Sequence, residues 1–342
     1  MKRSLCIIGL AALILVGCKH EESKRQYWNA EMESQHVEIV RVDNAILNVK
    51  ETSAKEDIQA LYDSFPEFMP YWAYDIMRMP DEYIEDSLAA FIRQTQDLNE
   101  YEQNMFADIT WLQQSLDQSF TRIHYLWPEM ETPSLYLYPS FLVPLYFYDI
   151  GYSDPIYYFG DNWFGIDADM YLGTDFPYYK QAVYEYKMLN VNPQRIPIDF
   201  VYAYLWRNIP YTSSKTWLLD QAVYQGKLMY LTAQLFDDKP GCEVMGWTQD
   251  QWNWAVQHEA DVWNLMQTER HLYSYDQLTI TNYIKDAPST SSVRQDSPGR
   301  LGIWIGWRIV EQYMEKHPEV SLQQLMAEPD AQKILTNSKY RP

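Results

Sequence analysis

The chain has 342 residues, of which 47% are hydrophobic, and its formal net charge at pH 7 is −20. A chain this acidic repels nucleic acids and anionic lipid headgroups, so we expect neither as a partner. Its length and apolar fraction are sufficient for one large hydrophobic core.

The N-terminus has the pattern of a bacterial lipoprotein signal. The apolar run from Leu5 to Gly17 is shorter than the about 20 residues that a membrane-spanning helix needs. It ends in Leu15-Val16-Gly17-Cys18, which fits a lipobox, whose cysteine is acylated and becomes the new N-terminus. Two or more acyl chains make such anchoring stable. We predict a signal peptide over residues 1–18, lipidation at Cys18 and a polar tether over residues 19–35.

The residues after the lipobox bear on location. Lys19, where an Asp would favour the inner membrane, favours the outer membrane, and the pair Glu21-Glu22 weakly resembles signals for export to the cell surface. We predict an outer-membrane lipoprotein that faces either the periplasm or the surface. Cleavage leaves Cys242 as the one free cysteine, so we expect no internal disulfide.

The remaining chain, residues 36–342, is predicted to be a single helix-rich α+β domain. His36 to Asn48 predicts one or two strands, and Ser53-Ala54-Lys55-Glu56 is a capping box for a helix that ends near Phe65. Further helices are expected over about 81–95 and 99–122. Residues 135–171 predict a small, irregular β region, and helices resume from there to the C-terminus.

Two amphipathic helices are predicted over Ile198–Ile209 and about Lys215–Phe236, the second capped by the run Thr212-Ser213-Ser214. The first presents a buried face that includes Tyr202 and Trp206. The second contains Gly226, and glycine costs about 1 kcal/mol in a helix interior relative to alanine. We therefore expect another backbone to pass close to Gly226.

This pair has the layout of a zinc peptidase without its metal ligands. In such an enzyme the first helix carries His-Glu-x-x-His and the second supplies a Glu. Here the first helix has neither His nor Glu, and Gln225 stands before Gly226. A neutral amide is a poor zinc ligand. We predict no metal, no cofactor and no catalytic residues; the simpler alternative is that the pair is ordinary core.

Glu259 is a second residue of interest. His258-Glu259 is half of a His-Glu-x-x-His motif, on a helix capped by Thr248 and Gln251. It falls within the apolar stripe Trp252, Val256, Trp263 and Met266. A buried carboxylate needs a partner. We expect Glu259 to be paired, with Arg300 as the leading partner because its planar fork binds two oxygens.

Three other patterns were considered. Ser297 and Pro298 are typical of a helix start, and Gly302 and Gly306 then give that helix a flat face. Five aspartates either bind calcium or form turns, namely Asp154, Asp161, Asp167, Asp169 and Asp175. The 29 Tyr and 13 Trp residues either fill the core, which we favour, or stack on sugars.

Four segments, in order, resemble the gliding-motility lipoprotein family (GldB) of Bacteroidetes: Tyr171–Lys180, Leu218–Lys227, Ser297–Val310 and Ser338–Pro342. The resemblance covers roughly Val37 to the C-terminus. The structural or interaction candidates Asp175, Asp220, Gln225, Gly226, Gly302 and Gly306 lie in these segments.

That family is distantly similar to zincin-type peptidases, and its members usually have Glu where this chain has Gln225. The resemblance implies a role in gliding and type IX secretion, as a non-enzymatic component that contacts another envelope protein. Two alternatives stay open: a divergent zincin-type peptidase with unrecognised ligands, and a glycan-binding surface lipoprotein.

Overall fold

The computed structural model describes residues 27–28, 30–79, 81–142, 156–159 and 162–342. The chain divides into a short unit, Met1–Glu31, and a large one, Met32–Pro342, which holds all the helices and strands given below. Cys18 lies outside the described residues. No helix in the described ranges has both the length and the apolar character needed to cross a bilayer.

The sheet of the large unit has four short strands in the order β1-β2-β4-β3. They are β1 (Ile39–Arg41), β2 (Ser134–Tyr138), β3 (Ile156–Phe159) and β4 (Trp163–Asp167). β1, β2 and β4 are parallel, whereas β3 is antiparallel to β4. Aromatic and branched residues dominate these strands, as expected for a half-buried pleated surface. The predictions of a small β region and of a helix-rich α+β fold are confirmed.

Helices surround this sheet in the first half of the unit. They are α1 (Val42–Leu47), α2 (Ala54–Ser64), α3 (Phe68–Tyr71), α4 (Asp81–Gln94), α5 (Gln96–Met105) and α6 (Thr110–Leu126). Three predictions were wrong in detail. Residues 42–47 are helical rather than extended, and the helix expected over 99–122 is two helices. The Ser53 side chain does not cap α2 but donates to Asp57 Oδ2 at 2.8 Å.

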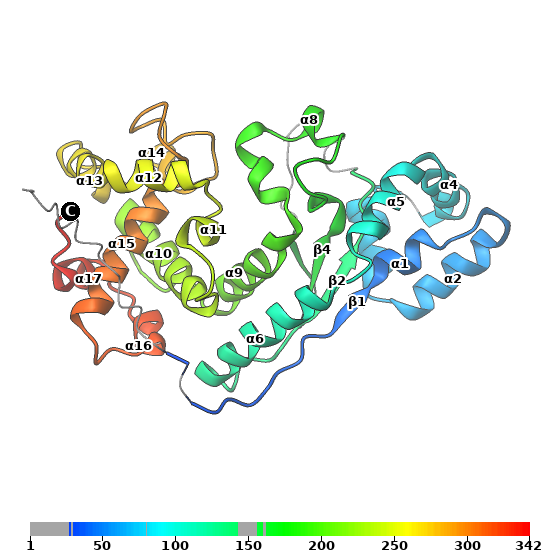
Figure 1. The fold of residues 1–342 in the computed structure, drawn as a ribbon, viewed down its shortest axis with the longest axis horizontal. Coiled ribbons are helices and arrows are strands. Elements are labelled where there is room, and N and C mark those ends of the chain that lie inside the picture. Colours follow the sequence, from blue (N-terminus) through cyan, green and yellow to red (C-terminus); the bar gives the residue numbers. More distant parts are fainter. Residues whose placement is uncertain (1–26, 29, 80, 143–155, 160–161) are drawn as a thin grey trace, which may run out of the picture. The chain divides into compact units, whose positions relative to one another are not determined.

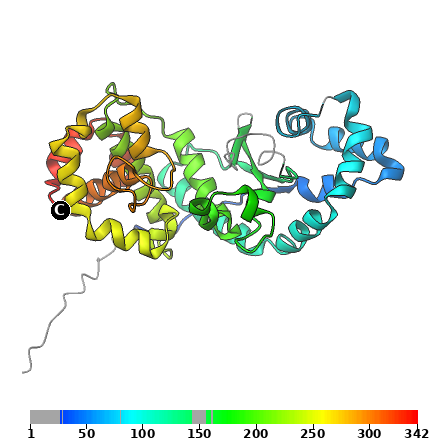
Figure 2. The ribbon, with the colours of Figure 1, turned by 90° about the horizontal axis from the view of Figure 1, so that it is seen from above.

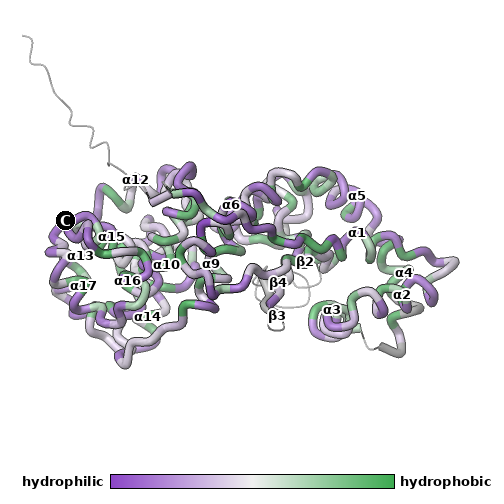
Figure 3. The backbone as a smooth tube through the Cα atoms, turned by 90° about the horizontal axis from the view of Figure 1, so that it is seen from below, coloured by the Kyte–Doolittle hydropathy of each residue, from purple (hydrophilic) through white to green (hydrophobic). Residues whose placement is uncertain are grey.

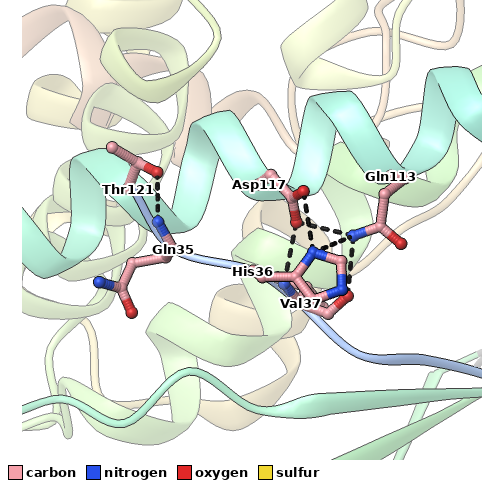
Figure 4. A network of polar contacts seen from close by, with 6 residues as sticks. All are labelled: Gln35, His36, Val37, Gln113, Asp117 and Thr121. Atoms are coloured by element: carbon pink, nitrogen blue, oxygen red, sulfur yellow. Dashed lines mark hydrogen bonds and ion pairs between the residues drawn. The ribbon is translucent and has the colours of Figure 1, made fainter. Parts of the chain in front are cut away.

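The extended segment that leads into β1 is held along α6 (Figure 4). Gln35 N donates to Thr121 Oγ1 and Val37 N donates to Asp117 Oδ1, both at 2.9 Å. Gln113 Nε2 donates to Val37 O at 2.8 Å. The three helix residues are four apart, so they lie on one face of α6. We call this contact the α6 clamp.

The second half, after β4, has helices as its main regular elements, joined by loops (Figure 1). Its helices are α8 (Tyr179–Ala182), α9 (Ile196–Asn208), α10 (Leu218–Leu235), α11 (Gly241–Met245), α12 (Gln249–Gln257), α13 (Glu259–Thr268), α14 (Gln277–Ile284), α15 (Leu301–Lys316), α16 (Leu322–Ala327) and α17 (Ala331–Ser338). α10 and α15 are each buried along most of their length and pack on one another (Figures 1 and 2).

Glycines set the distance between α10 and α15. A Cβ at Gly226 would lie 2.2 Å from Gly306 C, and one at Gly306 would lie 1.8 Å from Ala222 O. Both distances are far below van der Waals contact, so only glycine fits at either position. The close backbone expected at Gly226 is therefore confirmed. Gly302 faces a different helix, because its Cβ would lie 2.8 Å from Tyr283 Cβ of α14.

Two predicted helix starts were wrong, for the same physical reason. α10 begins at Leu218, without a side-chain cap from the run Thr212-Ser213-Ser214. α15 begins at Leu301 rather than at Pro298, and Leu301 N donates to Thr290 Oγ1 at 3.2 Å. In both cases tertiary contacts override the local capping pattern. By contrast, the Thr248–Gln251 capping box forms as predicted at α12.

Many of the large aromatic residues lie in the core. Trp72, Trp304, Tyr138, Tyr171, Tyr179 and Tyr283 are among the largest side chains that are fully buried. Along the helices, hydrophobic and hydrophilic residues alternate, as in amphipathic helices that cover a core (Figure 3). Trp206 and Val256, both predicted to face the core, are instead 56% and 50% exposed.

Candidate functional site

A cavity of about 480 Å³ opens beside the helix pair α9–α10; we call it the helix-pair cavity. The 3₁₀ segment Glu185–Val191 contributes Lys187 and Asn190 to its wall. Its other lining residues are Arg195, Asp199, Tyr202, Ala203, Trp206, Gln225, Asp286 and Arg300. Four of them recur along α9 at spacings of three and four, which places them on one face of the helix.

Tyr202 and Gln225 join the two helices across the cavity wall. The Tyr202 hydroxyl donates to Gln225 Oε1. Burial raises the pKa of Tyr202 to about 12, which the nearby positive charge of Arg300 partly opposes. The phenol is therefore neutral at physiological pH and acts as a hydrogen-bond donor. Gln225, which precedes Gly226 on α10, is engaged in a neutral hydrogen bond.

Two arginines anchor the neighbouring helix α11. Arg195 donates to Glu243 O and, at 3.3 Å, to Val244 O. Arg300 Nη1 donates to Met245 O at 3.1 Å. The last carbonyls of a helix lack partners within the helix and carry partial negative charge, which suits a guanidinium.

The charges in the cavity are only partly neutralised. Arg195 pairs with Asp199, which also accepts from the Tyr171 hydroxyl at 3.1 Å. Lys187 Nζ lies 3.7 Å from Asp286 Oδ2. Arg300 forms no ion pair within the described residues. Its backbone is left-handed, with φ of 64°, and the loop behind it is tight, since a Cβ at Gly299 would lie 2.1 Å from Ala287 O.

The donor set of the helix pair does not suit zinc. The amide Gln225 accepts a hydrogen bond from the phenol of Tyr202, and the one carboxylate on the α9 face, Asp199, is held by Arg195 and Tyr171. Among the residues that the structure describes, no three His, Cys, Asp or Glu side chains are grouped to hold a metal ion.

Glu259 lies outside the helix-pair cavity, and its predicted partner was wrong. Its side chain is 13% exposed, and Oε1 accepts from Arg308 Nε at 3.1 Å and from the Tyr340 hydroxyl at 2.7 Å. Arg308 also pairs with Glu311. The helix that contains Glu259 breaks at His258, so Glu259 stands in the first turn of α13. The expectation that Glu259 is buried and paired is met by Arg308 rather than by Arg300.

The other predicted residues are dispersed. Asp220 is 4% exposed in the first turn of α10, where it accepts from Ser213 Oγ at 2.8 Å, and burial raises its pKa. Asp175 is exposed beside a separate hollow of about 410 Å³. Gly226, Gly302 and Gly306 are buried at helix crossings, so they are packing residues. Of the predicted site residues, only Gln225 and Arg300 line the helix-pair cavity.

The other aspartates considered as calcium ligands fall into two groups. Asp154 and Asp161 lie outside the described residues. Asp167 Oδ1 accepts from Asp169 N at 3.2 Å, and Asp169 Oδ2 accepts from Ser140 N and Phe141 N at 2.9 and 2.6 Å. Both side chains are fully buried. Asp167 and Asp169 therefore stabilise turns, in keeping with the second of the two interpretations.

Sequence reasoning missed the residues that give the cavity its charge, namely Lys187, Arg195, Asp199 and Asp286. The available pattern was the spacing of four between Arg195 and Asp199, which is typical of a helical ion pair. Lys187 comes from the 3₁₀ segment Glu185–Val191 and Asp286 from the loop after α14, and no local pattern places either of them beside the cavity.

One of three comparisons with known proteins identifies a family. A family model described as "Gliding motility protein GldB" matches residues 23–342. Searches of the curated proteins and of the solved structures found no match.

Proposed function

The chain belongs to the gliding motility protein GldB family, and from this premise we propose that it is an outer-membrane lipoprotein that works by contacts with other envelope proteins rather than by catalysis. The lipobox ending in Cys18 supports the anchoring. The family membership supports a place in the gliding and type IX secretion machinery.

The observation that carries the non-enzymatic part is the Tyr202–Gln225 hydrogen bond. A zincin-type site needs imidazole or carboxylate ligands that converge from the two helices. Here the helices are joined by a neutral pair, and Asp199 is occupied by Arg195 and Tyr171.

The partner surface that we assign lies at Tyr275 and Leu278. They are the two most exposed large hydrophobic side chains in the described ranges, at 75% and 70%. Tyr275 and Leu278 are three residues apart in the chain, and large apolar side chains exposed close together are candidates for a partner contact. The start of α15, from Gly302 to Trp307, is buried throughout and offers no such surface.

Gliding cells that depend on this chain provide the test. We expect the double change Tyr275→Ser with Leu278→Ser to reduce gliding while the protein stays at its normal level. Tyr74→Ser is the matched control, because Tyr74 is 64% exposed and lies on a different part of the chain. Equal gliding by both variants would remove the assigned surface.

The enzymatic alternative has its own assay. The purified lipoprotein is analysed for bound metal and incubated with unfolded protein substrates, with and without a chelator. We expect neither stoichiometric zinc nor chelator-sensitive cleavage. Cleavage that stops on addition of chelator would establish a peptidase and overturn the proposal.

A further inference from the structure

We propose that the helix-pair cavity binds the free carboxylate at the C-terminus of a peptide, with Arg300 as its main anion ligand. This inference rests on the proposed function, because it treats the cavity as a binding site rather than as a catalytic one. It names the chemistry of a ligand that the cavity would take.

The argument begins with charge. The cavity is lined by three cationic side chains and two carboxylates, which leaves one net positive charge in a chain whose overall charge is −20. Lys187 and Arg195 each have an acidic partner. Arg300 uses one N–H for Met245 O, and the other four guanidinium N–H groups form no hydrogen bond within the described residues. One unpaired guanidinium suits one carboxylate, which it can bind with two parallel hydrogen bonds.

Rigidity is the second step. Arg300 is held at its backbone by a left-handed conformation, by the close packing of Gly299 on Ala287 and by the α15 start. Its side chain is fixed by Met245 O. An arginine held before the ligand arrives loses less conformational entropy on binding.

The neutral side chains Gln225 and Asn190, which also line the helix-pair cavity, favour a peptide over a simple anion as the ligand. Gln225 Oε1 accepts from Tyr202, so the Gln225 amide nitrogen is left as a donor toward a carboxylate. Asn190 Oδ1 is buried and has no hydrogen-bond partner in the described part of the chain. A buried acceptor of this kind calls for a donor. A peptide end supplies both a carboxylate and a backbone N–H.

The apolar part of the wall indicates the side chain that the peptide carries. Trp206 lines the cavity and is 56% exposed, next to Ala203 on the same face of α9. An aromatic or aliphatic terminal side chain packs well on such a surface. Ligands with several negative charges are disfavoured, because Asp199 and Asp286 would repel the additional charge.

The test measures binding of short peptides to the full lipoprotein in detergent by isothermal titration calorimetry. The probe is an N-acetylated pentapeptide that ends in Phe with a free carboxylate, compared with the same peptide as a C-terminal amide. We expect the amide to bind at least about tenfold more weakly, since a charge-assisted bidentate contact is lost. Equal affinity for acid and amide would overturn the proposal.

Variants assign the ligand residues. Arg300→Gln is expected to weaken binding of the free-acid peptide by about tenfold or more. Arg207→Gln makes the same charge change on α9 outside the cavity lining, and it is expected to leave the affinity unchanged. If Arg300→Gln destabilises the fold, Trp206→Ala provides an independent variant at an exposed position and is expected to weaken binding as well. Normal binding by a folded Arg300→Gln variant would contradict the assignment.

A third probe distinguishes a peptide from a simple carboxylic acid as the ligand. 3-Phenylpropionate has the carboxylate and the ring but no peptide N–H for Asn190. We expect it to bind more weakly than the peptide, and equal affinity would overturn the assignment to a peptide. Mass spectrometry of the recovered peptide separates the two proposals. Cleavage would contradict the non-enzymatic function, whereas an intact peptide that fails to bind would contradict this inference alone.

Discussion

Three fully buried carboxyl groups lie close together, those of Glu102, Asp167 and Asp169. Asp169 accepts from the backbone N–H groups of Ser140 and Phe141, which follow β2. Burial raises the pKa of Asp169 to about 6. Burial first, and then the charge of Asp169, raise the pKa of Glu102 well above its ordinary value. Asp169 accepts two backbone N–H groups, so it is the better site for the negative charge, and Glu102 is the better site for a proton.

This arrangement predicts a pH dependence of stability. A carboxyl whose pKa is higher in the folded than in the unfolded chain stabilises the fold at low pH, and this contribution is lost as the pH rises above the unfolded-state value. Each unit of pKa elevation corresponds to about 1.4 kcal/mol. We expect the free energy of unfolding to contain a term from Glu102 that falls over the pH range above the ordinary pKa of a glutamate, because the pKa of Glu102 is raised well above that value in the folded chain.

The change Glu102→Gln tests this term, because glutamine keeps the shape of the protonated acid and cannot ionise. We expect the variant to lose less stability than the wild type over the same pH range in urea unfolding. Glu100→Gln is the control, because Glu100 is exposed on the same helix, α5. The same pH slope for the wild type and for Glu102→Gln would show that Glu102 does not hold the proton.

At the scale of elements, the crossing of α10 and α15 organises the second half of the large unit. The helices approach until the backbone of one meets the backbone of the other at Gly226 and Gly306. The same approach places Gln225, the neighbour of Gly226, beside the helix-pair cavity, and the start of α15 delivers Arg300 to it. The crossing therefore positions the proposed ligand residues.

Replacement of Gly306 by Ala is expected to destabilise the protein, although alanine is the better helix former by about 1 kcal/mol. The added Cβ meets Ala222 O, a backbone atom that cannot rotate away, so overpacking at about 1–3 kcal/mol or more outweighs the propensity gain. Urea unfolding measures the difference. Ala260→Gly, at an exposed position of α13, reports the propensity effect alone. A stabilised Gly306→Ala variant would contradict the close crossing.

The same elements explain what could be predicted from the sequence. Gly226 was informative because a glycine inside a helix costs stability and so requires a reason. The partner of Glu259 could not be predicted from the sequence. The choice between Arg300 and Arg308 depends on how α13 and α15 pack, not on either helix alone. Trp206 was assigned to the core because periodicity cannot distinguish a core from a cavity. The cavity itself depends on loops that no local pattern places.

At the scale of the whole molecule, the N-terminal anchor gives the most direct prediction. If Cys18 is acylated, the change Cys18→Ala should release the protein from the membrane fraction, because a chain without acyl groups has no lipid to hold it. Cell fractionation followed by detection of the protein measures this. Cys242→Ala is the control, because Cys242 is a free, buried cysteine in the large unit. A Cys18→Ala variant that stays in the membrane fraction would contradict lipid anchoring.

The α6 clamp has a mechanical consequence for a protein held by such an anchor. Tension along the tether would load residues 35–37, where hydrogen bonds to Thr121, Asp117 and Gln113 are spread over two turns of α6. Force directed along this segment loads those bonds together, and then the parallel β1–β2 ladder behind them, in shear. Bonds loaded in parallel share the force, whereas bonds that are peeled break one at a time. If the chain is anchored through Cys18, the α6 clamp would bear a pull on the tether before the pull reaches the core.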